Sequence, residues 1–384
     1  MKSDSSRRNF LAAGLVLPAA GMATSQEAPQ APSSQPARSV APGAAAPAYR
    51  TLGKTGLKVT SVGFGCMITS DSSVISRAVD MGITYFDTAR VYQSGNNERM
   101  VGACLKGSRD KIVLSSKSMA RTPADAMAHL ETSLKELATD HLDIWYMHAR
   151  DNPAAIPDEL VATWEDAKKQ GKIRHIGVST HNPNAIVDRV LQAGKFEVLL
   201  STYNFTVGTN NDATYQRLAD AGIGLVAMKV MAPARPGGAA AKTNLGGPLA
   251  ALKWVLRNPR FATTIPSMRD MEMLDENVKA MSERFGPQDD KILAVLNEQV
   301  RPLYCRMCYQ CNGQCPKGAP VPETIRYLSY ADFYGEFALG REHFMALSEE
   351  ARAVRCSDCA TCAVHCPNGV RVAERLMRAQ ELFA

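Results

Sequence analysis

The sequence predicts an α/β protein, a (β/α)8 (TIM) barrel followed by a small cysteine-rich domain. Eight short apolar runs alternate with amphipathic stretches over residues 49–290, the pattern of parallel strands covered by helices. Eight of the ten cysteines fall in two tight clusters near the C-terminus, which indicates a local site within residues 300–384. A chain of 384 residues is long enough for one large and one small domain.

Each of the eight runs has the near-continuous apolar character of a buried parallel strand. An open doubly wound sheet is the competing arrangement, and it would carry a glycine-rich phosphate turn after its first strand. The segment Gly63-Phe64-Gly65-Cys66 lacks the third glycine of such a turn, so the barrel is favoured. The expected strands lie in residues 61–66, 83–87, 111–117, 142–148, 173–179, 197–203, 222–230 and 262–266.

The composition excludes several classes of protein. Hydrophobic residues make up 45% of the chain, which is ordinary for a globular protein. The net charge of +6 is not concentrated in a basic block, so nucleic acid is not an expected partner. No apolar run reaches the roughly 18 residues that a membrane span needs, so we expect no span in the mature chain.

The N-terminus has the order of regions found in an export signal. Arg7 and Arg8 precede a short apolar segment, residues 10–23, which ends in small residues that suggest cleavage after Ala23. The paired arginines resemble a twin-arginine (Tat) signal, with a generic Sec signal or a chance arginine pair as the alternatives. We therefore expect residues 1–23 to direct the chain to the periplasm or otherwise out of the cytoplasm.

Residues 24–48 are rich in Ala, Pro, Ser and Gln and contain almost no large apolar residue. Such a segment cannot build a core and is expected to be a disordered linker. No cysteine precedes Cys66, so a lipid anchor on an N-terminal cysteine is not expected.

Four polar residues follow the ends of the second, third and fourth runs: Asp87, Tyr92, Lys117 and His148. The C-terminal ends of barrel strands share one face, where catalysis takes place, so these residues are expected to converge. Singly, an Asp there commonly caps a helix, and a lone Tyr or His has a structural role. A buried lysine, however, needs a carboxylate partner, and Asp87 on the neighbouring strand can provide it.

Together these four residues suit proton transfer at a carbonyl group. A phenol has a pKa near 10, and a nearby ammonium is expected to lower the pKa of Tyr92 toward the working range. Tyr92 could then give a proton to a carbonyl oxygen, or take one from an alcohol. Asp87 would hold Lys117, and neutral His148 would donate a hydrogen bond to the oxygen on which charge develops.

The barrel region resembles the aldo/keto reductase family over residues 49 to about 285. The segments that carry the resemblance are residues 49–59, 86–89, 97–98, 115–117 and 142–148. The Asp, Tyr, Lys and His tetrad of the family corresponds to Asp87, Tyr92, Lys117 and His148. The resemblance implies an oxidoreductase that interconverts a small carbonyl compound and an alcohol.

The resemblance also implies that NAD(P) binds on the same face without a Rossmann domain. Its carboxamide pair corresponds to Ser179 and Thr180, where Thr180 replaces the usual Asn. Leu200 stands where the family has Gln, and Met228, which precedes Lys229, stands where many members have a stacking aromatic residue. These departures weaken the assignment of the cofactor.

The segment after the last expected strand resembles the part of the family that binds the adenosine phosphate. The basic residues that usually bind the 2′-phosphate are Ser267 and Met273 here, and only Arg269 could substitute. The sequence does not distinguish NAD from NADP. The cofactor-binding residues that the resemblance implies are Ser179, Thr180, Lys229, Pro266, Ser267, Arg269, Glu276 and Asn277.

Both cysteine clusters have the spacing C-x2-C-x2-C-x3-C-P, which is typical of [4Fe–4S] binding. A zinc site would leave four thiols unused, and disulfides would not explain the identical spacing or the two prolines. We expect two [4Fe–4S] clusters in a domain that resembles bacterial dicluster ferredoxins. The fourth cysteine of each run is expected to bind the other cluster. The ligands are Cys305, Cys308, Cys311 and Cys366 for one cluster, and Cys356, Cys359, Cys362 and Cys315 for the other.

Between the two runs lies an insert, residues 317–355, with aromatic residues at helical spacing. We expect a helix that packs this stripe on the clusters or on the barrel, with an electron path as the alternative. The insert occupies the place where many aldo/keto reductases have a loop that closes the substrate pocket. The aromatic residues are Tyr327, Tyr330, Tyr334 and Phe337.

Three functions remain open at this point. The first is an exported oxidoreductase that interconverts a carbonyl and an alcohol, with clusters that exchange electrons with an outside redox partner. The second is an electron-transfer protein whose barrel is not catalytic, and the third is an ordinary NAD(P)H-dependent reductase with structural clusters. Tat export and clusters assembled in the cytoplasm are mutually consistent, because Tat moves folded proteins.

Overall fold

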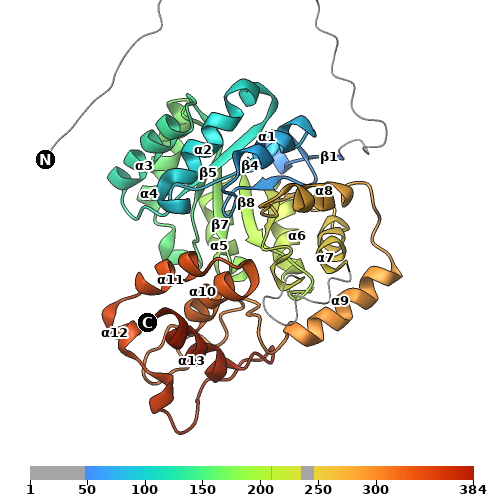
Figure 1. Ribbon diagram of the computed structural model, residues 1–384. Helices are drawn as coiled ribbons and strands as arrows, with labels where there is room; N and C mark the ends of the chain where they lie inside the picture. Colours follow the sequence, from blue (N-terminus) through green and yellow to red (C-terminus); the bar gives the residue numbers. More distant parts are fainter. Residues whose placement is uncertain (1–47, 209, 235–245) are drawn as a thin grey trace, which may run out of the picture. The chain divides into compact units, whose positions relative to one another are not determined.

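The computed structural model describes residues 48–208, 210–234 and 246–384 (Figure 1). These residues all belong to one unit, Ala45–Ala384. The expected signal segment, residues 1–23, and all but the last residue of the expected linker lie outside the described residues. Within the described ranges, none of the helices has the length and apolar character needed to cross a bilayer.

An eight-stranded parallel sheet forms the barrel, in the strand order β10-β9-β8-β7-β6-β5-β4-β3. Parallel bridges between Val62 and Thr264 and between Gly65 and Ser267 close the sheet on itself. Every expected apolar run contains or overlaps one strand, so the predicted barrel is confirmed. The strands are β3 (Phe64–Gly65), β4 (Tyr85–Asp87), β5 (Val113–Ser118), β6 (Leu142–Met147), β7 (Ile173–Thr180), β8 (Val198–Thr202), β9 (Gly224–Met228) and β10 (Phe261–Thr264).

Helices connect the strands and cover the outside of the barrel (Figure 1). Their starts are specified locally: the side chain of Thr122 accepts a hydrogen bond from Asp125 N, and Pro123 and Pro183 occupy first-turn positions. The helices are α1 (Ser72–Asp80), α2 (Asn96–Leu105), α3 (Pro123–Glu136), α4 (Asp158–Lys169), α5 (Pro183–Ala193), α6 (Asp212–Asp220), α7 (Gly247–Leu256) and α8 (Met271–Lys279).

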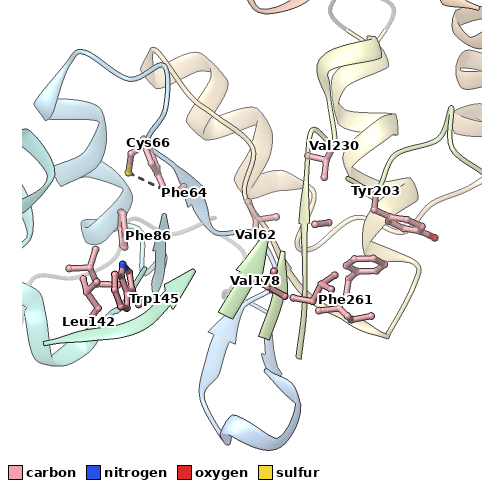
Figure 2. Packing of buried hydrophobic residues seen from close by; sticks show 14 of the residues in the cluster. Val62, Phe64, Cys66, Phe86, Leu142, Trp145, Val178, Tyr203, Val230 and Phe261 are labelled. Atoms are coloured by element: carbon pink, nitrogen blue, oxygen red, sulfur yellow. Dashed lines mark hydrogen bonds between the residues drawn. The ribbon is translucent and has the colours of Figure 1, made fainter. Parts of the chain in front are cut away.

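The main core lies between strands and helices, where Phe64, Phe86 and Val178 are fully buried (Figure 2). Trp145 on β6 stacks on Trp164 on α4, with ring centroids 3.8 Å apart. Close packing of this kind fixes the strands, and therefore the residues that follow their C-terminal ends.

A second core fills the barrel interior. The hydroxyl groups of Tyr85 and Tyr146 are hydrogen-bonded there at 2.7 Å. Gly177 on β7 has no room for a side chain, because a Cβ atom would lie 2.4 Å from the Tyr146 ring. The hairpin of β1 (Tyr49–Thr51) and β2 (Lys58–Thr60) contributes Val59 to this core.

The C-terminal region is helical apart from its cysteine loops. The predicted helix of the insert is α10, which packs against α11 and α13. The helices of this region are α9 (Pro287–Val300), α10 (Val321–Tyr334), α11 (Phe337–Met345), α12 (Glu349–Ala353) and α13 (Val372–Phe383).

Candidate active site

The structure brings Asp87, Lys117 and Tyr92 together at the C-terminal end of the barrel. Lys117 on β5 forms a buried ion pair with Asp87 on β4, and each residue is only 1% exposed. The ammonium also donates hydrogen bonds to Thr88 O at 2.7 Å and to Tyr92 Oη at 3.3 Å. Because these contacts fix Lys117, its charge is held beside the Tyr92 hydroxyl.

The turn after β4 positions Tyr92. This turn, Tyr92–Gly95, ends at Gly95, whose φ of 87° suits glycine. A Cβ atom on Gly95 would overlap the guanidinium of Arg90, which forms an ion pair with buried Glu98. Gln93 donates a hydrogen bond to Thr69 O at 2.8 Å, so the turn is fixed on both sides.

His148 directly follows β6 and lies beside Tyr92. The two rings are 5.9 Å apart and nearly perpendicular. Burial, together with the positive charge of Lys117, holds the pKa of His148 well below its ordinary value, so the ring is neutral near pH 7. Its Nδ1 has no hydrogen-bond partner among the described residues.

The pKa of Tyr92 differs from the sequence-based expectation. Burial and the negative charge of Asp87 raise this pKa well above 10, so the expected lowering by Lys117 is wrong for the protein in this state. The main reason is that the phenol is fully buried, which disfavours the phenolate, and the carboxylate of Asp87, paired with Lys117, adds to this effect. Tyr92 is therefore a protonated phenol.

A cavity of about 150 Å³ lies over the tetrad. Asp87, Tyr92, Lys117 and His148 line one part of it, and residues of α10 and α11 cover it. The predicted stripe of the insert thus packs on the barrel mouth through Tyr327, Tyr330 and Tyr334, whereas Phe337 is 47% exposed and lies outside the cavity. The cap residues of the cavity are Arg326, Tyr327, Tyr330, Phe333, Tyr334 and His343.

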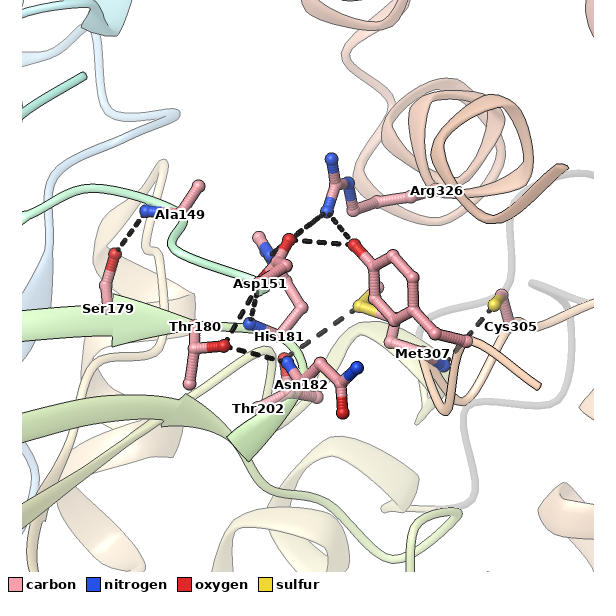
Figure 3. Close-up of polar contacts among 11 residues, drawn as sticks. Ala149, Asp151, Ser179, Thr180, His181, Asn182, Thr202, Cys305, Met307 and Arg326 are labelled. Atoms are coloured by element: carbon pink, nitrogen blue, oxygen red, sulfur yellow. Dashed lines mark hydrogen bonds and ion pairs between the residues drawn. The ribbon is translucent and has the colours of Figure 1, made fainter. Parts of the chain in front are cut away.

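A buried polar network, absent from the sequence-based predictions, joins the barrel to the cap (Figure 3). Arg326 on α10 contacts Asp151 Oδ2 at 3.0 Å and His181 Nδ1 at 3.1 Å. Tyr309 donates a hydrogen bond to the same carboxylate oxygen at 2.7 Å. The other carboxylate oxygen of Asp151 accepts hydrogen bonds from Thr180 Oγ1 and His181 N.

The candidate cofactor residues fall into two groups. Ser179, Lys229, Pro266, Ser267 and Arg269 line the cavity that contains the tetrad. The other three, Thr180, Glu276 and Asn277, do not line it.

The residues fit a dinucleotide in part. Ser179 accepts a hydrogen bond from Ala149 N and retains a free donor for a carboxamide, whereas Thr180 already donates to Asp151. Arg269 forms an ion pair with Glu336 at 3.5 Å. On α8, Asn277 is fully buried, yet neither polar atom of its side chain has a partner among the described residues. Because Asn277 is fully buried and does not line the cavity, its side chain is not placed to contact a nucleotide bound there.

The cysteine loops bring the predicted ligands into two groups. Burial and the neighbouring thiols of Cys311, Cys308 and Cys366 raise the pKa of Cys305 to about 12. None of the ten cysteines, all of which lie in the described ranges, forms a disulfide. Across the described ranges, no group of three or more His, Cys, Asp or Glu side chains is placed to hold a single metal ion.

The second group is centred on Cys356. Burial raises its pKa, and Cys315, Cys362 and Cys359 contribute. The thiols that affect Cys305 and Cys356 are the ones that crosswise ligation would place in the same cluster. Crosswise ligation itself stays a prediction.

The cysteine loop of the first group also contacts the barrel. Met307 is buried, and its sulfur lies 3.9 Å from the hydroxyl of Thr202 at the end of β8. Met307 and Tyr309 both have positive φ, 57° and 60°. The loop that contains three cysteines is therefore fixed to the edge of the barrel mouth by its intervening residues (Figure 3).

Comparison with curated proteins finds oxidoreductase relatives. The chain is 28% identical over 313 residues to the uncharacterized oxidoreductase YrpG of Bacillus subtilis (strain 168), a match that covers 65% of this chain and 95% of YrpG. It is 30% identical over 168 residues to the uncharacterized oxidoreductase YqkF of the same organism, which covers 39% of this chain but only 55% of YqkF.

Solved structures share the barrel. The aldo-keto reductase AKR11C1 from Bacillus halodurans matches with a TM-score of 0.56 and 24% identity, over 65% of this chain and 96% of that one. An aldo-keto reductase from Klebsiella pneumoniae, solved with NADP and acetate, matches with a TM-score of 0.55 and 22% identity, over 65% and 94%. These likenesses show the fold.

Two family matches divide the chain. Residues 69–245 match the aldo/keto reductase family, and residues 304–371 match the 4Fe-4S dicluster domain. The chain therefore contains an aldo/keto reductase domain followed by a 4Fe–4S dicluster domain, and it is an oxidoreductase of the aldo/keto reductase type.

Proposed function

We propose that the chain interconverts a small carbonyl compound and its alcohol in the barrel, with NAD(P) as the hydride carrier. The observation that carries this proposal is the convergence of Asp87, Lys117, Tyr92 and His148 on one cavity. A bound NAD(P) would supply or accept the hydride. Ser179, Ser267 and Arg269, which line the cavity, are the residues that would hold it.

Each residue of the tetrad has a separate role in the proton transfer. Tyr92, a protonated phenol, gives its proton to the carbonyl oxygen on which negative charge develops. Lys117 then stabilises the phenolate through its hydrogen bond to Tyr92 Oη, and Asp87 keeps Lys117 in place. His148 is neutral and donates a hydrogen bond that orients the carbonyl oxygen.

The test is Tyr92→Phe in anaerobically purified protein. We expect kcat for carbonyl reduction to fall by about 10²-fold or more, because the phenol acts in the transition state, with nucleotide binding nearly unchanged. Tyr49→Phe is the matched control, since Tyr49 is exposed on the N-terminal hairpin. Near-normal turnover by Tyr92→Phe would show that Tyr92 is not the acid.

We also propose that the dicluster domain holds two [4Fe–4S] clusters, which exchange electrons with an outside redox partner after export through Tat. The support is the pair of cysteine runs with identical spacing, together with the paired arginines at residues 7–8. No free NAD(P)H pool is expected in a periplasm, so the nucleotide would be bound before export and retained.

Protein taken from the periplasm would be denatured and its released small molecules assayed. Stoichiometric NAD(P) supports retention. If NAD(P) is absent and added NAD(P)H does not bind, the chain is an electron-transfer protein with a non-catalytic barrel. That second function is favoured by one observation: Thr180 donates its hydroxyl hydrogen to Asp151 instead of leaving it for a carboxamide.

A further inference from the structure

Lys229 follows β9 at the barrel mouth. Its φ of 56° lies in the left-handed region, which a lysine occupies only when its surroundings impose it. Asn204 donates a hydrogen bond to its carbonyl oxygen at 3.0 Å, which holds the backbone in this state. The ammonium lies 4.6 Å from the ring centre of Tyr330 and 5.2 Å from that of Tyr334. Lys229 is thus directed under α10, into the cavity that contains the tetrad.

Lys229 differs from the other cations of the cavity in forming no ion pair with any described acidic residue, although the more distant charge of Asp151 acts on it. Lys117 is paired with Asp87, Arg269 with Glu336, and Arg326 with Asp151. In the part of the chain that the structure describes, no carboxylate forms an ion pair with Lys229. A buried ammonium without a counter-charge is costly, and burial, followed by the positive charge of Arg326, lowers its pKa to about 7.

The charges that act on Lys229 come from α10 and from the loop after β6. The charged groups that affect Lys229 are Arg326 and Asp151, which belong to the network at the end of β7. Its own charge acts on His181 and on His343 of α11. The sequence-based candidates for the adenosine end of a nucleotide lie on other elements. Ser267 follows β10, and Asn277 lies on α8.

We propose that Lys229 binds the carboxylate of the substrate, so that the chain acts on small oxo acids and the corresponding hydroxy acids. This inference rests on the proposed function and names its substrate class. A carboxylate at Lys229 supplies the missing counter-charge, while the carbonyl group of the same molecule reaches Tyr92 and His148 in the same cavity. Tyr330 and Tyr334 provide apolar walls between the two ends.

A binding experiment tests the site without turnover. Benzoate and uncharged benzamide are titrated into the anaerobically prepared full chain, its Lys229→Met variant and its Lys58→Met variant. Lys58 is exposed on the N-terminal hairpin, so Lys58→Met makes the same change in net charge away from the cavity. We expect benzoate binding to weaken about ten- to a hundredfold in Lys229→Met alone, with benzamide binding unchanged. Equal benzoate binding by wild type and Lys229→Met overturns the proposal.

A turnover experiment links the site to the substrate. The matched probes are 4-carboxybenzaldehyde and methyl 4-formylbenzoate, with NADPH. We expect Lys229→Met to raise KM for 4-carboxybenzaldehyde about ten- to a hundredfold and to leave its kcat unchanged. Both kinetic constants for methyl 4-formylbenzoate should stay the same. An equal loss of NADPH affinity in this variant would assign Lys229 to the nucleotide and overturn the proposal. If wild type binds benzoate through Lys229 but reduces neither aldehyde, the proposed function fails and the anion site stands.

Discussion

At the scale of single residues, the ionisation of Lys229 makes ligand binding dependent on pH. With its pKa at about 7, Lys229 is mostly neutral at pH 8 in the empty cavity. A bound carboxylate favours the ammonium and raises this pKa toward the ordinary lysine value, so benzoate binding should take up a proton at pH 8 and hardly any at pH 6.

Calorimetric titration in two buffers of different ionisation enthalpy measures this proton uptake. The groups that face Lys229 are Tyr330, Tyr334 and Arg326 on α10, His343 on α11, and Asp151 and His181 on the barrel. Burial lowers the pKa of both histidines to about 4, so they stay neutral between pH 6 and 8. The uptake should vanish in Lys229→Met, and an uptake that persists there would assign it to another group.

The convergence of the four tetrad residues could be predicted from the sequence, whereas their electrostatics could not. Asp87, Lys117 and His148 could be found because strand ends are readable from apolar runs and barrel topology gathers them. The direction of the Tyr92 pKa shift depends on how closely Asp87 neutralises Lys117 and how fully the cap buries the phenol. Neither quantity is a property of the local sequence.

At the scale of elements, α10 is the lid of the active site, and Arg326 is its main polar anchor. Arg326 and Asp151 are 175 residues apart and are both buried or nearly so. Arg326→Met should lower the melting temperature of the anaerobically prepared protein by several degrees, because it leaves the carboxylate of Asp151 without its cation. Asp151→Asn in the same background should restore part of the loss.

The double-mutant cycle gives the coupling between the two residues. Arg378, which pairs with Asp332 on the solvent side of α10, provides the matched control, since its side chain is 53% exposed and such pairs contribute little. If Arg326→Met and Arg378→Met lower the melting temperature equally, Arg326 does not anchor the lid.

The helix α10 was predictable from its spacing, but its docking site was not. The stripe of Tyr327, Tyr330 and Tyr334 indicates an apolar face. It does not indicate whether that face packs on the clusters or on the barrel. Asp151, His181 and Tyr309 gave no signal, because each has an ordinary polar role when read alone. Only the tertiary structure joins them around Arg326.

At the scale of the whole molecule, the two cysteine groups stand in different relations to the barrel. The loop of Cys305, Cys308 and Cys311 contacts the barrel edge through Met307 and Tyr309. In the other group, Cys359 and Cys362 are exposed. A cluster bound by the first group would therefore support the cap and the cavity, and a cluster bound by the second would be suited to exchange electrons with a partner.

The variants Cys366→Ala and Cys315→Ala distinguish crosswise ligation from ligation within each run. If ligation is crosswise, Cys366→Ala removes a ligand from the cluster of Cys305 and frees the loop that holds the barrel edge. Benzoate binding should then weaken, and amide exchange at residues 305–311 should quicken, whereas Cys315→Ala should disturb the cavity far less. Iron analysis should find about half of the wild-type iron in each variant. The reverse assignment, with Cys315→Ala disturbing the cavity more, would show that each run closes on its own cluster.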